Sequence, residues 1–170
     1  MHHFLEKAKN ASRIIATLEP RTKDALLHQM AQALEENCSK ICEENAKDLE
    51  DARTNNLSSA LVDRLTLNEK RVQGMATAIR EIAALREPVG RILDGWVVPS
   101  GLRIEKVTIP IGVIGIIYES RPNVTSDTAA LCFKSGNVCV LKGGKEANHS
   151  NAIIAALLQD VLEKNNLPVP

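Results

Sequence analysis

The sequence predicts an α/β protein in which a helical N-terminal half precedes a β-hairpin and the start of a parallel sheet. Three observations support this prediction. Apolar residues recur at helical spacing up to residue 86, β-branched residues become frequent after the stretch EPVG at residues 87–90, and two short apolar runs then alternate with helical segments. Strands and helices that alternate along a chain are typical of a parallel sheet with helices packed on it.

The helical half, residues 1–86, contains several segments with one apolar face. In residues 24–36 the apolar face consists of Leu26, Leu27, Met30 and Leu34. Residues 40–52 and 68–85 repeat this spacing, which is that of amphipathic helices packed against a core. The pairs Glu19-Pro20 and Asn55-Asn56 separate the segments.

A hairpin is predicted for residues 87–110. The β-branched segments 91–98 and 102–109 flank the turn sequence Pro-Ser-Gly at residues 99–101. The charged residues Arg103, Glu105 and Lys106 indicate that one face of the second strand is partly exposed. Because an exposed strand edge can pair with another chain, we expect this hairpin to act in bridging or oligomerisation.

Residues 111–170 are predicted to begin the parallel sheet. The apolar run 112–117 is typical of a strand covered on both faces, and residues 138–141 form a second buried strand. Residues 123–135 and 151–164 are predicted helices, and Gly136 is the expected end of the first. Ligands bind such sheets beyond the carboxyl ends of the strands, which here are the polar stretches 118–123 and 142–146.

The composition excludes several classes of function. The 21 basic and 21 acidic residues balance, and aromatic residues make up 2% of the chain, so neither a basic surface nor base-stacking platforms for nucleic acid are expected. The longest apolar run, at residues 107–117, is too short to span a membrane. The N-terminus becomes polar at once and does not resemble a signal peptide. The four cysteines fit no zinc pattern and no secretory disulfide frame, so we expect a cytoplasmic protein without a metal site.

The second polar stretch contains Lys142, Gly143, Gly144 and Lys145. Two glycines let the backbone approach a ligand closely, and two lysines suit phosphate groups near the start of the following helix. The alternative is a strand-to-helix turn with solvated lysines. The glycine-rich dinucleotide fingerprint and the P-loop pattern are both absent.

The first polar stretch contains Ser120, Arg121 and Asn123. Arg121 has the planar fork that binds a carboxylate or phosphate through two hydrogen bonds, and Ser120 and Asn123 are suited to orient a substrate or an oxyanion. Structural roles are equally concrete: Asn123 is a good helix N-cap, Pro122 fits a first helical turn, and Arg121 is suited to a solvated surface.

Several motifs together resemble the gamma-glutamyl phosphate reductases, a branch of the aldehyde dehydrogenase superfamily. They are the stretches IPIGVIG (109–115), YESRPN (118–123), KSGN (134–137) and LKGG (141–144), with NAKDL (45–49) and DRLTL (63–67) in the helical half. The resemblance covers essentially the whole chain. It implies an aldehyde-dehydrogenase-type nucleotide-binding domain, of which residues 111–170 are the incomplete beginning and residues 1–86 a helical part.

The resemblance also implies a reaction. The family reduces L-glutamyl 5-phosphate with NADPH to L-glutamate 5-semialdehyde and phosphate, the second step of proline biosynthesis from glutamate. A cysteine thiolate displaces the phosphate, and hydride then reduces the resulting thioester. The implied partners are the small-molecule substrate, a second copy of the chain at full length, and glutamate 5-kinase as a candidate.

Site residues follow by position. Lys142 matches the superfamily lysine that contacts the adenosine ribose, and Lys145 stands where relatives that prefer NAD often carry glutamate, so a 2′-phosphate is expected there. Substrate binding is expected of Ser120, Arg121 and Asn123. Many relatives place an oxyanion-donating asparagine where this chain has Glu119 or Ser120, so the residue in that role stays open.

No catalytic residue is predicted in this chain. The family's cysteine nucleophile is expected beyond Pro170, and Cys38, Cys42, Cys132 and Cys139 are interpreted as packing residues. Two hypotheses follow: the chain is the N-terminal part of a reductase and inactive alone, or it is a non-catalytic nucleotide-binding or dimerising module. An isolated two-stranded parallel sheet is expected to leave an uncovered apolar face and to favour association.

Overall fold

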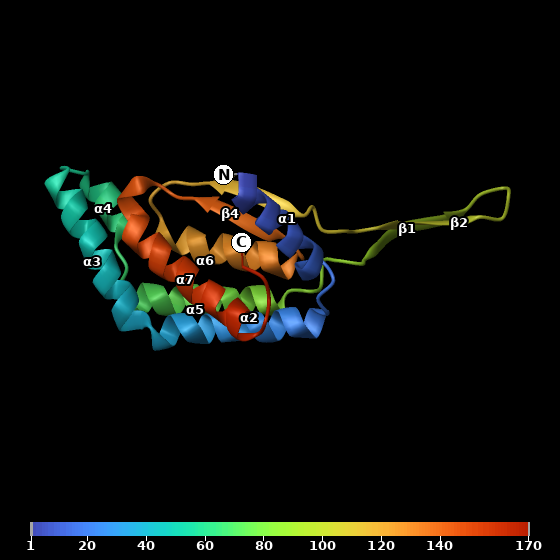
Figure 1. The fold of residues 1–170 in the computed structure, drawn as a ribbon, viewed down its shortest axis with the longest axis horizontal. Helices are drawn as coiled ribbons and strands as arrows, with labels where there is room; N and C mark the ends of the chain where they lie inside the picture. The colour runs from blue at the N-terminus through green and yellow to red at the C-terminus, as the bar shows by residue number, and fades with distance from the viewer. Residues whose placement is uncertain (1, 170) are drawn as a thin grey trace.

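The computed structural model describes residues 2–169, so Met1 and Pro170, the outer bounds of the predicted segments, lie outside the described residues. Figure 1 shows a layered body from which a long hairpin projects. The order of elements is α1 (His2–Ile15), α2 (Pro20–Glu36), α3 (Cys38–Thr54), α4 (Ser59–Leu65), α5 (Glu69–Ala84), β1 (Ile92–Val97), β2 (Arg103–Val107), β3 (Val113–Ile117), α6 (Pro122–Lys134), β4 (Val138–Lys142), the 3₁₀ turn η1 (Lys145–Ala147) and α7 (Asn148–Lys164).

The helical half packs α2 against α5 along the apolar faces that the sequence predicts. Leu27, Leu34 and Ile79 are each 0% exposed, because residues spaced by three or four positions lie on one side of a helix. The side chain of Asn68 caps α5 by accepting a hydrogen bond from the amide of Arg71 at 2.9 Å. The short helix α4 was not distinguished by the sequence pattern.

The body stacks its layers around a small parallel sheet. Strands β3 and β4 pair in parallel from Val113↔Val138 to Ile117↔Lys142. Helix α1 lies on one face of this sheet, and α6 and α7 lie between the other face and the α2–α5 layer (Figure 1). The crossover from β3 through α6 to β4 is the βαβ unit that the sequence predicts.

The expectation that residues 112–117 are covered on both faces is wrong for β3. Ile117 is 87% exposed and Gly115 is also exposed, because within the described residues β4 is the only strand beside β3 and α1 packs mainly on β4. In β4, Val138 is buried and the following residues are half-buried. The predicted uncovered apolar face is therefore present in this chain.

The hairpin is more exposed than its sequence suggests. Strands β1 and β2 pair antiparallel and extend away from the body (Figure 1). Its large apolar side chains face solvent, among them Ile92, Leu93, Trp96, Val97 and Leu102. A surface of this kind is typical of a segment that packs against another part of an assembly.

Gly136 ends α6 as predicted. Its φ of 73° lies in the left-handed region, and the amide of Asn137 donates to the carbonyl of Cys132 at 2.8 Å. A Cβ at position 136 would lie 2.8 Å from Cγ of Pro110, so the glycine also permits a close contact with the chain that enters β3.

Among the helices of residues 2–169, none combines the length and apolar character that a membrane span needs.

Candidate functional site

The two polar stretches lie side by side at the carboxyl end of the parallel sheet. The amide of Tyr118 donates to the carbonyl of Lys142 at 3.1 Å, and Oγ of Ser120 donates to Oε2 of Glu146 at 2.6 Å. The hydrogen bond from Ser120 lowers the pKa of Glu146. This adjacency follows from parallel pairing, which brings the ends of β3 and β4 to the same edge.

A chain of hydroxyl and amide groups fixes the geometry behind these loops. The hydroxyls of Tyr118 and Thr125 are hydrogen-bonded at 2.7 Å, and the Thr125 hydroxyl donates to Oδ1 of Asn151 at 2.8 Å. Burial raises the pKa of Tyr118. A Cβ at Gly143 would lie 2.3 Å from Nδ2 of Asn151, so a larger residue would displace this network. The network ties β3, α6 and α7 together beneath the Lys142 loop.

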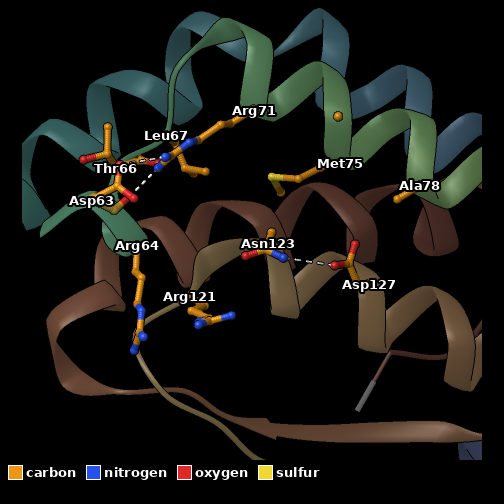
Figure 2. A pocket seen from close by; sticks show the side chains of 11 residues that line it. Asp63, Arg64, Thr66, Leu67, Arg71, Met75, Ala78, Arg121, Asn123 and Asp127 are labelled. Atoms are coloured by element: carbon orange, nitrogen blue, oxygen red, sulfur yellow. Dashed lines mark hydrogen bonds and ion pairs between the residues drawn. The ribbon is translucent and has the colours of Figure 1, made fainter. Parts of the chain in front are cut away.

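A cavity of about 440 Å³ opens between helices α4, α5 and α6, and we call it the arginine cleft (Figure 2). Its polar lining consists of Asp63, Arg64, Thr66, Arg71, Arg121, Asn123 and Asp127. Arg121 and Asn123, two of the predicted substrate-binding residues, therefore share one cavity. Ser120 does not line it, because its hydroxyl is turned toward Glu146.

A second cavity, of about 310 Å³, lies over the other loop, and we call it the lysine groove. The predicted cofactor-binding residues Lys142, Gly143, Gly144 and Lys145 all line it, together with Asn148 at the start of α7. Both lysines are exposed and neither forms an ion pair within the described residues. Nζ of Lys142 donates to the carbonyl of Gly143 at 3.4 Å. Ammonium groups without an ion pair beside a helix start are suited to phosphate and hydroxyl groups of a nucleotide.

The structure corrects the capping role considered for Asn123. Arg121 occupies the N-cap position of α6 without a capping side-chain bond, and Pro122 begins the helix. The amide of Asn123 instead donates to Oδ2 of Asp127, one turn later, at 3.1 Å. The guanidinium of Arg121 has no hydrogen bond or ion pair within the described part of the chain, so it is available to a ligand.

Four charged residues of the cleft were not predicted as site residues: Asp63, Arg64, Arg71 and Asp127. Arg64 extends from α4 toward the Arg121 end of the cleft (Figure 2) and lies 3.7 Å from Glu119. Asp127 lies farther along α6, and burial raises the pKa of its carboxyl group. The spacing of four residues between Asn123 and Asp127 was the available signal, since such pairs face each other on a helix. Arg71 is already bound to Asp63 and to the carbonyl of Thr66.

A buried network of hydrogen bonds joins the helices around both cavities, and we call it the central junction. It consists of the side chains of Asn45, Asp48 and Ser150 and the backbone groups of Leu65, Leu67, His149 and Ser150. Asp48 accepts from the amides of His149 and Ser150 at 3.0 and 2.8 Å and from the Ser150 hydroxyl at 2.6 Å. These amides belong to the first turn of α7, so Asp48 caps that helix from α3.

Asn45 completes the junction. Its amide donates at 2.9 Å to the carbonyl of Leu65 and at 2.9 Å to Oγ of Ser150, and its oxygen accepts from the amide of Leu67 at 2.7 Å. The motifs at residues 45–49 and 63–67 thus meet in one structural contact. This cap also explains why α7 begins at Asn148, three residues before the predicted start.

None of the cysteines lines either cavity. Cys132 is buried on α6, and Cys139 on β4 has its pKa raised by the neighbouring Cys132 thiol and by burial. Cys38 and Cys42 lie on α3, where burial and the adjacent Cys38 raise the pKa of Cys42. Within residues 2–169 no three His, Cys, Asp or Glu side chains are grouped to hold a metal ion. Cys132 is buried, and the partly buried Cys38 and Cys42 pack against the hydrophobic core.

Comparison with known proteins identifies the family. Residues 1–169 match the model of the aldehyde dehydrogenase family. The chain belongs to the aldehyde dehydrogenase family. Membership of this family implies a nicotinamide nucleotide cofactor, and the exposed lysines, the glycines and the helix start of the lysine groove fit the phosphate and ribose groups of such a molecule.

Closely similar proteins carry a more specific name. The chain is 65% identical over 168 residues to the gamma-glutamyl phosphate reductase of Aliarcobacter butzleri, covering 99% of this chain and 41% of that protein. The crystal structure of gamma-glutamyl phosphate reductase from Thermotoga maritima superposes with a TM-score of 0.92 at 41% identity, over 96% of this chain and 39% of the other. The Saccharomyces cerevisiae reductase also gives a TM-score of 0.92, at 32% identity, over 99% and 43%. This aldehyde dehydrogenase family chain thus spans about 41% of the length of the curated relatives it matches.

Proposed function

We propose that this chain is the N-terminal part of a gamma-glutamyl phosphate reductase. The complete enzyme would reduce L-glutamyl 5-phosphate with NADPH to L-glutamate 5-semialdehyde and phosphate, in proline biosynthesis. The observation that carries the proposal is the 65% identity over 168 residues to a protein of that name. The arginine cleft and the lysine groove, at adjacent loops of one sheet edge, support it.

In this proposal the lysine groove binds the cofactor. Lys142, with Gly143 and Gly144 beside it, would contact the ribose, and Lys145 would face the 2′-phosphate that distinguishes NADPH from NADH. When bound, the nicotinamide supplies hydride. Ser120 orients the two loops relative to each other through Glu146, and a Cβ at Gly144 would lie 2.4 Å from its Oγ. A glycine is therefore needed where the loops meet.

Arg121 and Asn123 are the proposed substrate contacts. The substrate carries a phosphoryl group and a carboxylate, and an unpaired guanidinium is suited to either through two parallel hydrogen bonds. None of the four cysteines lies in these cavities, so the nucleophile of the complete enzyme is proposed to lie outside residues 1–170. We therefore expect the chain alone to bind but not to turn over substrate.

Two further proposals concern the domain division and assembly. We propose that residues 1–86 and 111–170 are parts of the nucleotide-binding domain. We also propose that the hairpin of residues 87–110, which exposes Trp96 and Leu102, forms the contact between the subunits of a homo-oligomer. A cytoplasmic location and glutamate 5-kinase as a partner stay predictions.

A chimera tests the proposed function. The aligned first segment of the Aliarcobacter butzleri reductase is replaced by this chain, and NADPH formation from NADP, phosphate and L-glutamate 5-semialdehyde is followed by absorbance. We expect turnover within about tenfold of the parent, equivalent to about 1.4 kcal/mol of activation free energy. The chain alone should give none.

The cofactor is tested in the same chimera. Lys145→Glu should reduce the preference for NADP over NAD by about tenfold, because a carboxylate repels the 2′-phosphate.

A folded chimera without activity would contradict the reductase proposal. That result would favour the alternative, a non-catalytic binding or dimerising module.

A further inference from the structure

Asp127 in the arginine cleft has a buried carboxylate oxygen without a donor. Among the described residues, the buried side-chain atoms lacking a hydrogen-bond partner are Oδ1 of Asp127 and Oε2 of Glu87. Glu87 has a compensating cation, because Nζ of Lys23 lies 2.6 Å from its other oxygen. For Asp127 the other oxygen receives the amide of Asn123 at 3.1 Å, and the neighbouring Ser126 hydroxyl also interacts with this carboxyl group, so its donors within the chain are neutral. A buried charge without a partner is costly. We therefore expect a hydrogen-bond donor from outside the chain to bind this oxygen.

The position of Asp127 shows where that donor would come from. The carboxylate lies on the face of α6 that is turned toward α5 (Figure 2), in the wall of the cleft. Rotation about its last side-chain torsion exchanges the two oxygens, and this torsion is broad for aspartate. Either oxygen can therefore be presented to a ligand in the cleft.

Some charged side chains around the cleft have a partner of opposite charge close by, and others do not. Asp63 and Arg71 bind each other at 2.8 Å and are both occupied. Arg64 is held loosely by Glu119 at 3.7 Å, and Arg121 is free within the described residues. The cleft thus offers a free cation at the start of α6 and a free anion six residues later, which is about 9 Å along a helix axis.

We infer that the arginine cleft binds the zwitterionic head of an amino-acid substrate, with Asp127 accepting from the ammonium group and Arg121 binding a carboxylate. This inference rests on the proposed function, whose substrate carries such a head. Beside its proposed contact with the substrate, Asn123 then also holds the Asp127 carboxylate in place through its amide. Ligands that lack the ammonium would leave Asp127 unpaired and would bind less tightly.

Binding to the 170-residue chain tests this with matched ligands. L-Glutamate carries the ammonium group, and glutarate has the same carbon chain and both carboxylates without it. Affinities are measured by following backbone amide signals of α6 in two-dimensional NMR spectra. We expect the wild-type chain to prefer L-glutamate by about tenfold. In Asp127→Asn this preference should disappear through loss of L-glutamate affinity.

The control is Asp160→Asn, the same chemical change on α7 outside the cleft, where the carboxylate pairs with Lys164. This variant should keep the preference. Equal affinity of the wild-type chain for both ligands, or no binding of either, would overturn the inference without any need for a variant to fold. A preference for L-aspartate over L-glutamate that depends on Asp127 would support the zwitterion site but count against a glutamyl substrate. The activity of the chimera tests the reductase proposal independently of this result.

Discussion

The central junction and the arginine cleft both place an aspartate between helices, but the two carboxyl groups have opposite surroundings. Asp48 is 2% exposed and accepts three hydrogen bonds from the first turn of α7. Asp127 has one buried oxygen with no donor and the other bonded to a neutral amide. A fully satisfied buried group stabilises the fold, and an unsatisfied one costs stability. The difference separates a structural polar site from one that is suited to a ligand.

The largest expected effect is at the central junction. Asp48→Ala should lower the free energy of unfolding by about 3 kcal/mol, because two backbone amides and a hydroxyl lose their acceptor in a buried site. Urea denaturation followed by circular dichroism measures this. The matched variant Asp51→Ala, on the exposed side of the same helix, should change stability by less than about 0.5 kcal/mol. A loss at Asp48 no larger than at Asp51 would remove the contrast between the two regions.

A smaller effect of opposite sign is expected in the cleft. Asp127→Asn should raise the free energy of unfolding by about 1 kcal/mol at neutral pH, because it removes a charge that has no partner and is about half-buried. Burial raises the folded-state pKa of Asp127 above its unfolded value of about 3.9, so its protonated form favours folding. That contribution is complete below the unfolded pKa and is lost as pH rises through the folded pKa.

The stability gap between Asp127→Asn and the wild-type chain should therefore widen from acidic to neutral pH. Melting temperatures of the two proteins, measured in parallel in buffers from about pH 3.5 to about pH 7, test this. The range begins near the unfolded-state pKa of aspartate, about 3.9. Glu35, Glu44 and Glu146 have lowered pKa values and act in the opposite direction, but they are common to both proteins and cancel in the difference. A gap that is constant over this range would mean that Asp127 carries no uncompensated charge.

The smallest effect on stability is expected at Arg121. Arg121→Gln should leave the free energy of unfolding within about 0.5 kcal/mol of wild type, because the guanidinium is exposed and has no partner within the described residues. The same change should weaken glutarate and L-glutamate alike by about tenfold, since both lose a charge-assisted hydrogen bond. Thermal melts and the NMR titration measure the two outcomes together. A strong loss of stability would reclassify Arg121 as a structural residue.

Much of the fold could be predicted from the sequence. Helices α2, α3 and α5 follow from the spacing of apolar residues such as Leu26, Met30 and Ile79, and the βαβ unit follows from two apolar runs around a helix that ends at Gly136. These signals are local, because they depend on residues a few positions apart. Two predictions were wrong. β3 is open where the sequence indicates burial, because burial depends on distant neighbours, and Asn123 does not cap α6, because the helix already begins at Pro122.

The candidate site shows the same division. Sequence position alone predicts that residues 118–123 and 142–146 meet at one sheet edge, and the bonds between Tyr118 and Lys142 and between Ser120 and Glu146 agree with it. It did not predict Arg64 or Asp127 as cleft residues, because their proximity requires α4 and α5 to pack beside α6. Nor did it predict that Asp48 caps a helix that begins 100 positions later along the chain.

The sequence by itself determined helices α2, α3, α5, α6 and α7, the hairpin, the parallel βαβ order and the family, since each is encoded in local spacing or in short motifs. Only the tertiary structure decided which polar groups are satisfied. It gave Asp48 three donors and left Asp127 with a bare oxygen, although both are aspartates on amphipathic helices. The physical reason is that hydrogen-bond satisfaction depends on which distant backbone and side-chain groups packing brings within about 3 Å, and no local pattern records that.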